Sequence, residues 1–103
     1  MRMYPRKLFG ETWWENDKTR LKFDSFVLTS MSFEFSVHSG GAQYEGTLRK
    51  VDEKCFRGEI KRDRSFPIPA HCRLEEDEDG CTLTGRWHEG ARDHEWHGSL
   101  VDE

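Results

Sequence analysis

Four histidines in the second half of the chain have the residue type and spacing closest to a chemical site. His88, His94 and His97 lie within ten residues, and His71 precedes them. Imidazole nitrogens are common zinc ligands, so the cluster raises the hypothesis of a zinc site. The alternation of the flanking residues, however, predicts His88 and His97 on a polar face and His94 on the apolar one. It also predicts an exposed row of His71, Arg86 and His97, in which the arginine would repel a cation. We therefore expect a solvated surface and no metal site.

The three cysteines do not form a site either. Cys72 and Cys81 are predicted to face inward on adjacent strands, four residues out of register. That offset is roughly 13 Å at the rise of a strand, which a disulfide cannot span. Cys55 is predicted to face outward. The chain has no Cys-x-x-Cys pair, glycine-rich phosphate loop or nucleophile elbow, so we expect free thiols, no cofactor and no enzymatic activity.

The last part of the chain is typical of a β-hairpin with one apolar side. Glycine and apolar residues alternate with polar ones on both sides of Gly90–Asp93, the period of a strand with one buried face. A turn at this segment would place Trp87 opposite Trp96 and Gly85 opposite Gly98. A one-residue slip would move both pairs to the wrong face, so the pattern predicts a definite register.

A second hairpin is predicted in the first half. Residues 31–37 alternate strictly between apolar and polar, and two glycines follow in Ser39–Ala42. Two glycines suit the positive φ values of a type I′ turn. This turn would set Val37 opposite Tyr44, with both side chains on the apolar face.

These elements predict an all-β fold, an antiparallel up-and-down meander of about eight short strands closed into a small barrel. No stretch shows a helical apolar stripe, and closure would cover the apolar face of every strand and remove the sheet edges. A two-sheet sandwich is the rival architecture. We expect residues 1–103 to form a single domain, with residues 1–8 as a polar lead-in.

Stacking the predicted registers gives a layer of glycines beneath a layer of aromatic residues. The glycine layer consists of Gly46, Gly58, Gly85 and Gly98, and the aromatic layer includes Tyr44, Trp87 and Trp96. Two interpretations are open. The glycines can accommodate neighbouring aromatic rings in a filled core, or they can form the floor of a cavity that the aromatic residues line.

The pattern resembles the avidin and lipocalin group of ligand-binding barrels. The resemblance rests on Gly10 and Trp13 in the opening strand, on Thr84–Trp87, and on Trp96–Leu100 in the closing strand. It implies an up-and-down barrel with a pocket at its wider end. The chain has no counterpart of the polar residues that hold biotin, so biotin is not implied.

The expected function is therefore non-enzymatic binding of a small apolar or aromatic ligand. The predicted ligand-binding residues are Trp13, Tyr44, Trp87 and Trp96, with Gly46, Gly58, Gly85 and Gly98 beneath them; Trp14 could close the same end in place of Trp13. The alternative is a filled barrel that acts as a protein-interaction module through its outer face or its loops.

Charge and hydropathy narrow the range of partners. The net charge is −4 and the charges are mixed along the chain, whereas a nucleic-acid-binding domain is expected to carry a basic excess. No stretch could span a membrane as a helix, and the first residues lack the apolar run of a secretory signal. We expect a cytoplasmic protein with no nucleic-acid or membrane partner.

Overall fold

The computed structural model describes residues 3–14 and 17–102, with the backbone alone for residues 17–19. Eight strands account for most of these residues, and no helix occurs among them. They are β1 (Arg6–Trp14), β2 (Asp17–Leu28), β3 (Ser32–Ser39), β4 (Ala42–Lys50), β5 (Cys55–Arg62), β6 (Ile68–Glu76), β7 (Gly80–Glu89) and β8 (Arg92–Asp102).

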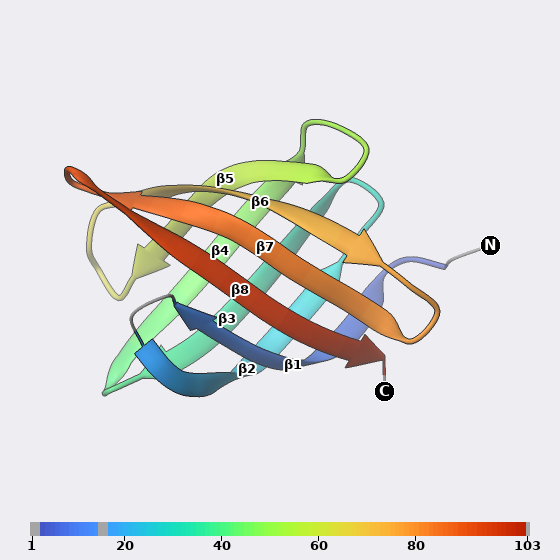
Figure 1. Ribbon diagram of the computed structural model, residues 1–103, viewed down its shortest axis with the longest axis horizontal. Helices are drawn as coiled ribbons and strands as arrows, with labels where there is room; N and C mark the ends of the chain where they lie inside the picture. Colours follow the sequence, from blue (N-terminus) through green and yellow to red (C-terminus); the bar gives the residue numbers. More distant parts are fainter. Residues whose placement is uncertain (1–2, 15–16, 103) are drawn as a thin grey trace.

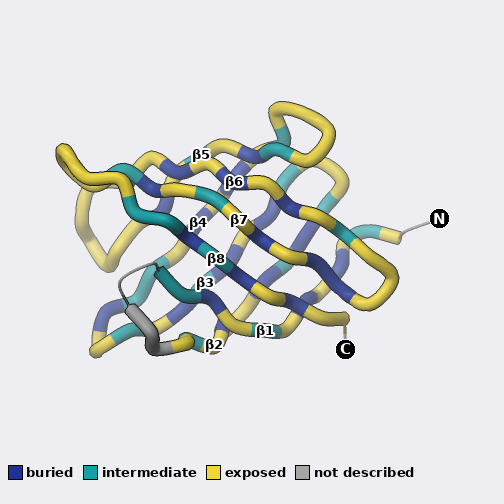
Figure 2. Tube along the Cα trace, in the orientation of Figure 1, coloured by how far each residue is buried: buried dark blue, intermediate teal, exposed yellow. Residues whose placement is uncertain are grey.

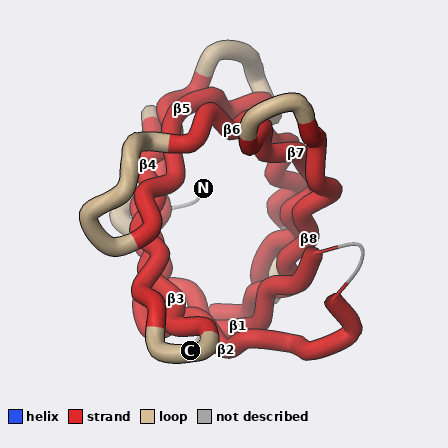
Figure 3. Tube along the Cα trace, turned by 90° about the vertical axis from the view of Figure 1, so that its left-hand side faces the viewer, coloured by secondary structure: helices blue, strands red, loops and turns tan. Residues whose placement is uncertain are grey.

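The strands form one closed antiparallel barrel in chain order, with β1 paired to β8 (Figure 1). Viewed from one end, the strands make a complete ring (Figure 3). The predicted meander barrel is thereby confirmed, and the sandwich alternative is wrong. Each strand alternates buried and exposed residues because its inner face packs on the core and its outer face meets solvent (Figure 2).

The two ends of the barrel differ in what they carry. Both chain termini and the loops after β2, β4 and β6 lie at one end, which we call the terminal end (Figure 1). The loops after β3, β5 and β7 lie at the opposite end, the distal end.

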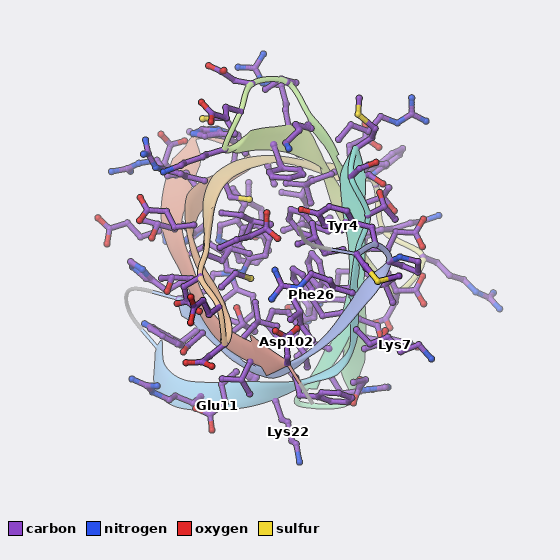
Figure 4. All side chains as sticks on the ribbon, turned by 90° about the vertical axis from the view of Figure 1, so that its right-hand side faces the viewer. Tyr4, Lys7, Glu11, Lys22, Phe26 and Asp102 are labelled. Atoms are coloured by element: carbon purple, nitrogen blue, oxygen red, sulfur yellow. The ribbon has the colours of Figure 1, made fainter. Side chains whose placement is uncertain are left out.

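At the terminal end, β1 begins at Arg6, inside the segment expected to be a polar lead-in. Arg6 is buried because its guanidinium is matched by two carboxylates: the distance from Nη1 to Glu76 Oε1 is 2.6 Å, and that from Nη2 to Asp102 Oδ2 is 2.7 Å. The Tyr4 hydroxyl also donates to Glu76. These contacts join β1, β6 and β8, and Figure 4 shows Tyr4 and Asp102 at this end of the barrel.

Two of the predicted registers are confirmed. Val37 lies opposite Tyr44 across a two-residue turn in which Gly40 and Gly41 have φ values of 57° and 85°. Such positive φ values favour glycine, as a type I′ turn requires. On the other side of the barrel, Cys72 lies opposite Gly85, also as expected.

The predicted register of the last hairpin is wrong by two residues. Trp87 lies opposite His94, and Gly85 lies opposite Trp96. The turn contains only Gly90 and Ala91, with Gly90 at a φ of 65°, rather than the four residues expected. A two-residue shift keeps every side chain on its predicted face, so Trp87 and Trp96 are both buried even though they are not opposite each other.

The pairing of β4 with β5 is also shifted by two residues, and these shifts remove the predicted glycine layer. Gly46 lies opposite Ile60, not Gly58, and Gly58 lies opposite Leu48 and Ala70. Large side chains therefore alternate with glycines around the barrel instead of stacking above them.

The interior is filled by side chains. Trp96, Phe33, Leu48 and Leu83 are fully buried in one continuous apolar core, and Figure 4 shows Phe26 inside the barrel. Trp96 does not line any of the main surface hollows formed by the described residues. The filled-core interpretation of the glycines is thus the one that the structure favours.

The glycines serve close approach rather than a cavity. A Cβ atom at Gly46 would lie 2.2 Å from Cε1 of Phe35, whose ring occupies that space. At Gly85 a Cβ would lie 2.3 Å from the carbonyl oxygen of His71, so the backbone of β6 itself occupies the position. Gly98 is less restricted, because the nearest atom, Cβ of Leu83, would be 3.3 Å away.

We predict that Gly85→Ala destabilises the barrel and that Gly98→Ala changes its stability much less. Overpacking at Gly85 should lower the free energy of unfolding by ~1–3 kcal/mol because backbone, not a flexible side chain, must move. For a domain of this size the melting temperature should fall by at least about 4 °C. Thermal denaturation followed by circular dichroism measures both variants, and equal melting temperatures for Gly85→Ala and the wild type would contradict the close approach.

We also predict that Arg6→Met destabilises the terminal end. The change removes the partner of Glu76 and Asp102, and because both carboxylates keep some contact with water we expect a loss of roughly 1–3 kcal/mol. Lys7→Met is the matched control, since Lys7 is the next residue of β1 and points outward (Figure 4). Equal stability of the two variants in urea denaturation would show that the Arg6 ion pairs contribute nothing.

Candidate functional site

A buried hydrogen-bond chain joins β8 to β1 and decides which residues of β1 face inward. The indole N–H of Trp96 donates to Oγ1 of Thr12 at 2.8 Å, and the Thr12 hydroxyl donates to the backbone carbonyl of His97 at 2.7 Å. Both Thr12 and Trp96 are fully buried. With Thr12 inside, strand alternation turns Trp14 inward and Trp13 outward.

Three aromatic side chains meet inside the barrel at its distal end, beside the hydrogen-bonded Trp96 and Thr12. The ring centroids of Trp14 and Trp87 are 5.3 Å apart, and Tyr44 lies 6.0 Å from Trp14 and 6.1 Å from Trp87. His94 completes the group, with its ring 5.4 Å from Trp87. We call Trp14, Tyr44, Trp87 and His94 the aromatic cluster. Trp87 is buried, and the other three are half-buried.

The aromatic cluster contains two indole N–H groups without an acceptor among the described residues. Nε1 of Trp14 and Nε1 of Trp87 are both shielded from solvent, and neither makes a hydrogen bond within residues 3–14 and 17–102. Buried donors are nearly always paired, and an unpaired one costs about 1–3 kcal/mol. Trp96, which lies deeper in the barrel, is paired with Thr12, so the contrast marks the distal end as the place where hydrogen-bonding capacity is left unused.

Of the four aromatic residues predicted to bind a ligand, the structure brings two together. Tyr44 and Trp87 share the aromatic cluster. Trp96 belongs to the core beneath it and contacts Phe35 at 5.3 Å between ring centroids.

Trp13 is misplaced in the prediction. It lies on the outer surface, stacked on His97 with centroids 5.7 Å apart, and the guanidinium carbon of Arg20 sits 4.1 Å from its ring centroid. Trp14, the alternative considered from the sequence, takes the inward position. The alternation of Leu8, Gly10 and Thr12 is the sequence feature that indicates Trp14 as the inward residue. Gly10 and Trp13 are an odd number of residues apart, so they cannot share a face of a regular strand.

The predicted glycines do not form the floor of a cavity beneath the aromatic residues. Gly46, Gly58 and Gly85 are each covered by a neighbouring ring or strand, and Gly98 packs near Leu83. No ligand-binding role for these positions follows from the geometry.

The histidines face as expected, with one correction. His94 points inward to Trp87, while His71 and His88 lie on the outer face with rings 5.3 Å apart. The exposed row contains His71 and Arg86 as predicted, but Glu95, not His97, follows Arg86, because of the two-residue shift in the last hairpin. Within the described ranges no group of histidine, cysteine and acidic side chains has the geometry of a metal site.

Burial makes the two inner thiols unreactive. Cys72 and Cys81 are free and buried, and Cys81 pairs with Glu76 while Cys72 pairs with Gly85, the four-residue offset predicted. Burial raises the pKa of the Cys72 thiol well above its ordinary value, and it raises the pKa of Cys81 to about 12. Since the thiolate is the nucleophile, neither residue is suited to catalysis.

Comparison with known proteins gives no further assignment. No protein-family model, curated protein or solved structure matches the chain. Of what the resemblance to avidin and lipocalin barrels implied, the structure shows the architecture, an eight-stranded closed antiparallel barrel. Among the described residues there is also no helix long and apolar enough to cross a membrane.

We predict that Trp96→Phe destabilises the protein more than Trp87→Phe. Both changes remove an indole from a buried position, but only the first also removes a hydrogen bond, that to Thr12. The difference in unfolding free energy should be about 1–2 kcal/mol. Chemical denaturation of both variants measures it, and a larger loss for Trp87→Phe would refute the distinction between a paired and an unpaired indole.

Proposed function

We propose that the protein is a non-enzymatic binding barrel whose small ligand sits on the aromatic cluster at the distal end. The observation that carries the proposal is the pair of unpaired indole N–H groups of Trp14 and Trp87. An oxygen acceptor on a ligand could pair with either donor, and each donor has already lost its hydrogen bonds to water, so the new bond would recover a cost that the free protein bears. The filled interior means that the ligand occupies the end of the barrel, not its centre.

The neighbouring groups suggest the class of ligand. Rings of Trp14, Tyr44 and Trp87 offer faces for an aromatic or planar apolar molecule, and such contacts contribute about 0.5–1.5 kcal/mol each beyond area burial. The Arg62 guanidinium carbon lies 5.8 Å from the Tyr44 ring centroid, which adds a cation at the rim. We therefore propose a planar, largely apolar molecule that carries a carbonyl or carboxylate oxygen.

Access to the donors requires a small rearrangement. Tyr44 and Trp14 are only half-buried and are the side chains that can swing outward, whereas Trp87 is buried beneath them.

The non-enzymatic assignment is supported by the two buried inner thiols, whose raised pKa values leave them protonated at neutral pH.

A fragment screen read by NMR tests the proposal. Bicyclic aromatic carboxylates and carboxamides are titrated into the labelled protein, each beside its matched hydrocarbon. We expect saturable shifts of the Trp14 and Trp87 indole N–H signals with the oxygen-bearing fragments, and weaker effects from the hydrocarbons, which offer no acceptor.

Two variants give the controls. Trp87→Phe should bind at least about tenfold more weakly, whereas Trp13→Phe, on the outer surface, should bind as the wild type does. If no fragment shifts either signal, or if Trp13→Phe loses binding as strongly as Trp87→Phe, the aromatic cluster is a packing feature and not a ligand site.

A further inference from the structure

The outer face of the barrel carries a row of three arginines and one histidine on four adjacent strands. Across β4, β5, β6 and β7, Arg49 lies opposite Arg57, Arg57 opposite His71, and His71 opposite Arg86. All four side chains are exposed. Like charges directly opposite each other destabilise a sheet, and here they occur in a chain whose net charge is −4.

A hollow lies in the middle of this row. Its volume is about 430 Å³, and its basic lining comes from Arg57, His71, Arg73 and Arg86, with Thr84 beside them. Phe56, Cys72 and Gly85 are also part of its lining. The hollow thus brings several hydrogen-bond donors from adjacent strands together around one concave surface.

Nearby carboxylates neutralise the hollow only in part. Glu75 accepts from Nε of Arg73 at 2.9 Å, and Glu95 lies 3.8 Å from Arg86 and 3.6 Å from His97. Arg57 lies between Arg49 and His71, and among the described residues no carboxylate forms an ion pair with it.

The titration of His71 is consistent with an excess of positive charge. Its pKa is lowered, first by burial and then by His88, Arg57 and Arg86, while Asp93 acts in the opposite direction. An anion placed in the hollow would offset the effect of the arginines, so its binding should be accompanied by a rise in the pKa of His71.

We propose that this hollow binds a compact dianion of the phosphate monoester class. Guanidinium groups form paired hydrogen bonds to phosphate oxygens, and Arg57, Arg73 and Arg86 approach the hollow from three adjacent strands. The hollow shares no residue with the aromatic cluster, so this proposal does not depend on the one above. An anion site on the outer face fits the alternative function, in which a filled barrel interacts through that face.

The surrounding charges favour a compact anion over a nucleic acid. Exposed Glu59 and Glu75 lie on the same outer face of β5 and β6, and Glu95 lines the hollow itself. A long polyanion would pass over these carboxylates, whereas a single phosphate group needs only the arginines between them.

Titration of the full chain with inorganic phosphate, at ionic strength held constant with chloride, tests the proposal by NMR. We expect saturable shifts of backbone amides around Arg57, His71 and Arg86. Phosphate should also raise the pKa of His71, measured from its imidazole signals.

Arg57→Gln should weaken phosphate binding by about tenfold or more, whereas Lys61→Gln, an exposed cation of the same strand outside the hollow, should leave it unchanged. Arg57→Gln should itself raise the pKa of His71 in phosphate-free buffer, because Arg57 lowers it in the native protein. That second readout remains informative if binding by the variant is too weak to measure.

Two further probes identify the source of the phosphate. A phosphoserine peptide and glycerol 3-phosphate are compared, each beside its unphosphorylated form, and binding by either phosphorylated probe alone supports the site. Non-saturable shifts, an equal loss in Lys61→Gln, or binding only to single-stranded RNA with a steep salt dependence would overturn it.

Discussion

Closure of the barrel depends on the seam between β1 and β8, which a hydrogen-bonded pair of buried side chains, Trp96 and Thr12, joins from inside. The indole N–H of Trp96 reaches Thr12, whose hydroxyl donates back to the carbonyl of His97. Both side chains lie in the dry interior, where a donor without an acceptor is costly. A shift of β1 by one residue would leave the indole unpaired and would turn Trp14 outward and Trp13 inward. The interaction therefore fixes both the closure and the composition of the distal end.

The two ends of the barrel differ in how far their buried hydrogen-bonding groups are paired within the protein. At the terminal end, Arg6 is matched by Glu76 and Asp102, so its hydrogen-bonding capacity is used within the protein. At the distal end, the N–H groups of Trp14 and Trp87 have no acceptor in the part of the chain that the structure describes. The interior between the ends is filled, which leaves the distal end and the outer face as the surfaces on which a partner can act.

The sequence predicts the faces of the strands well and their registers less well, for a physical reason. Alternation of apolar and polar residues determines which side of the sheet a residue occupies. The shifts in the β4–β5 and β7–β8 pairings are of two residues, which preserves that side, whereas Trp13 of β1 lies on the opposite face from the one predicted. The register of a hairpin depends in addition on the number of residues in its turn. Gly40 and Gly41 identify a two-residue turn, but Gly90 and Ala91 are embedded in a polar segment that also fits a longer loop. The shift at that turn and the equal shift between β4 and β5 together account for the predicted glycine layer and its cavity, which the structure does not contain.

The candidate site was predicted only in part because it depends on contacts between distant strands. Tyr44 and Trp87 follow from alternation, but the choice of Trp14 over Trp13 depends on Thr12, whose inward position is fixed by Trp96 in the last strand. The unpaired state of two indoles and the alignment of Arg49, Arg57 and Arg86 likewise arise from pairing across the sheet, and a single strand read alone contains no sign of either.

Hydrogen exchange of the four indole N–H groups, followed by NMR in the ligand-free protein, tests the central claim most directly. The claim is that the seam is paired and dry while the distal end holds unpaired donors. Trp96 should exchange slowest, near the limit set by global unfolding, and Trp14 and Trp87 should exchange far faster, through local opening of the distal end. Rapid exchange at Trp96, or protection of Trp14 and Trp87 equal to that of Trp96, would contradict the account.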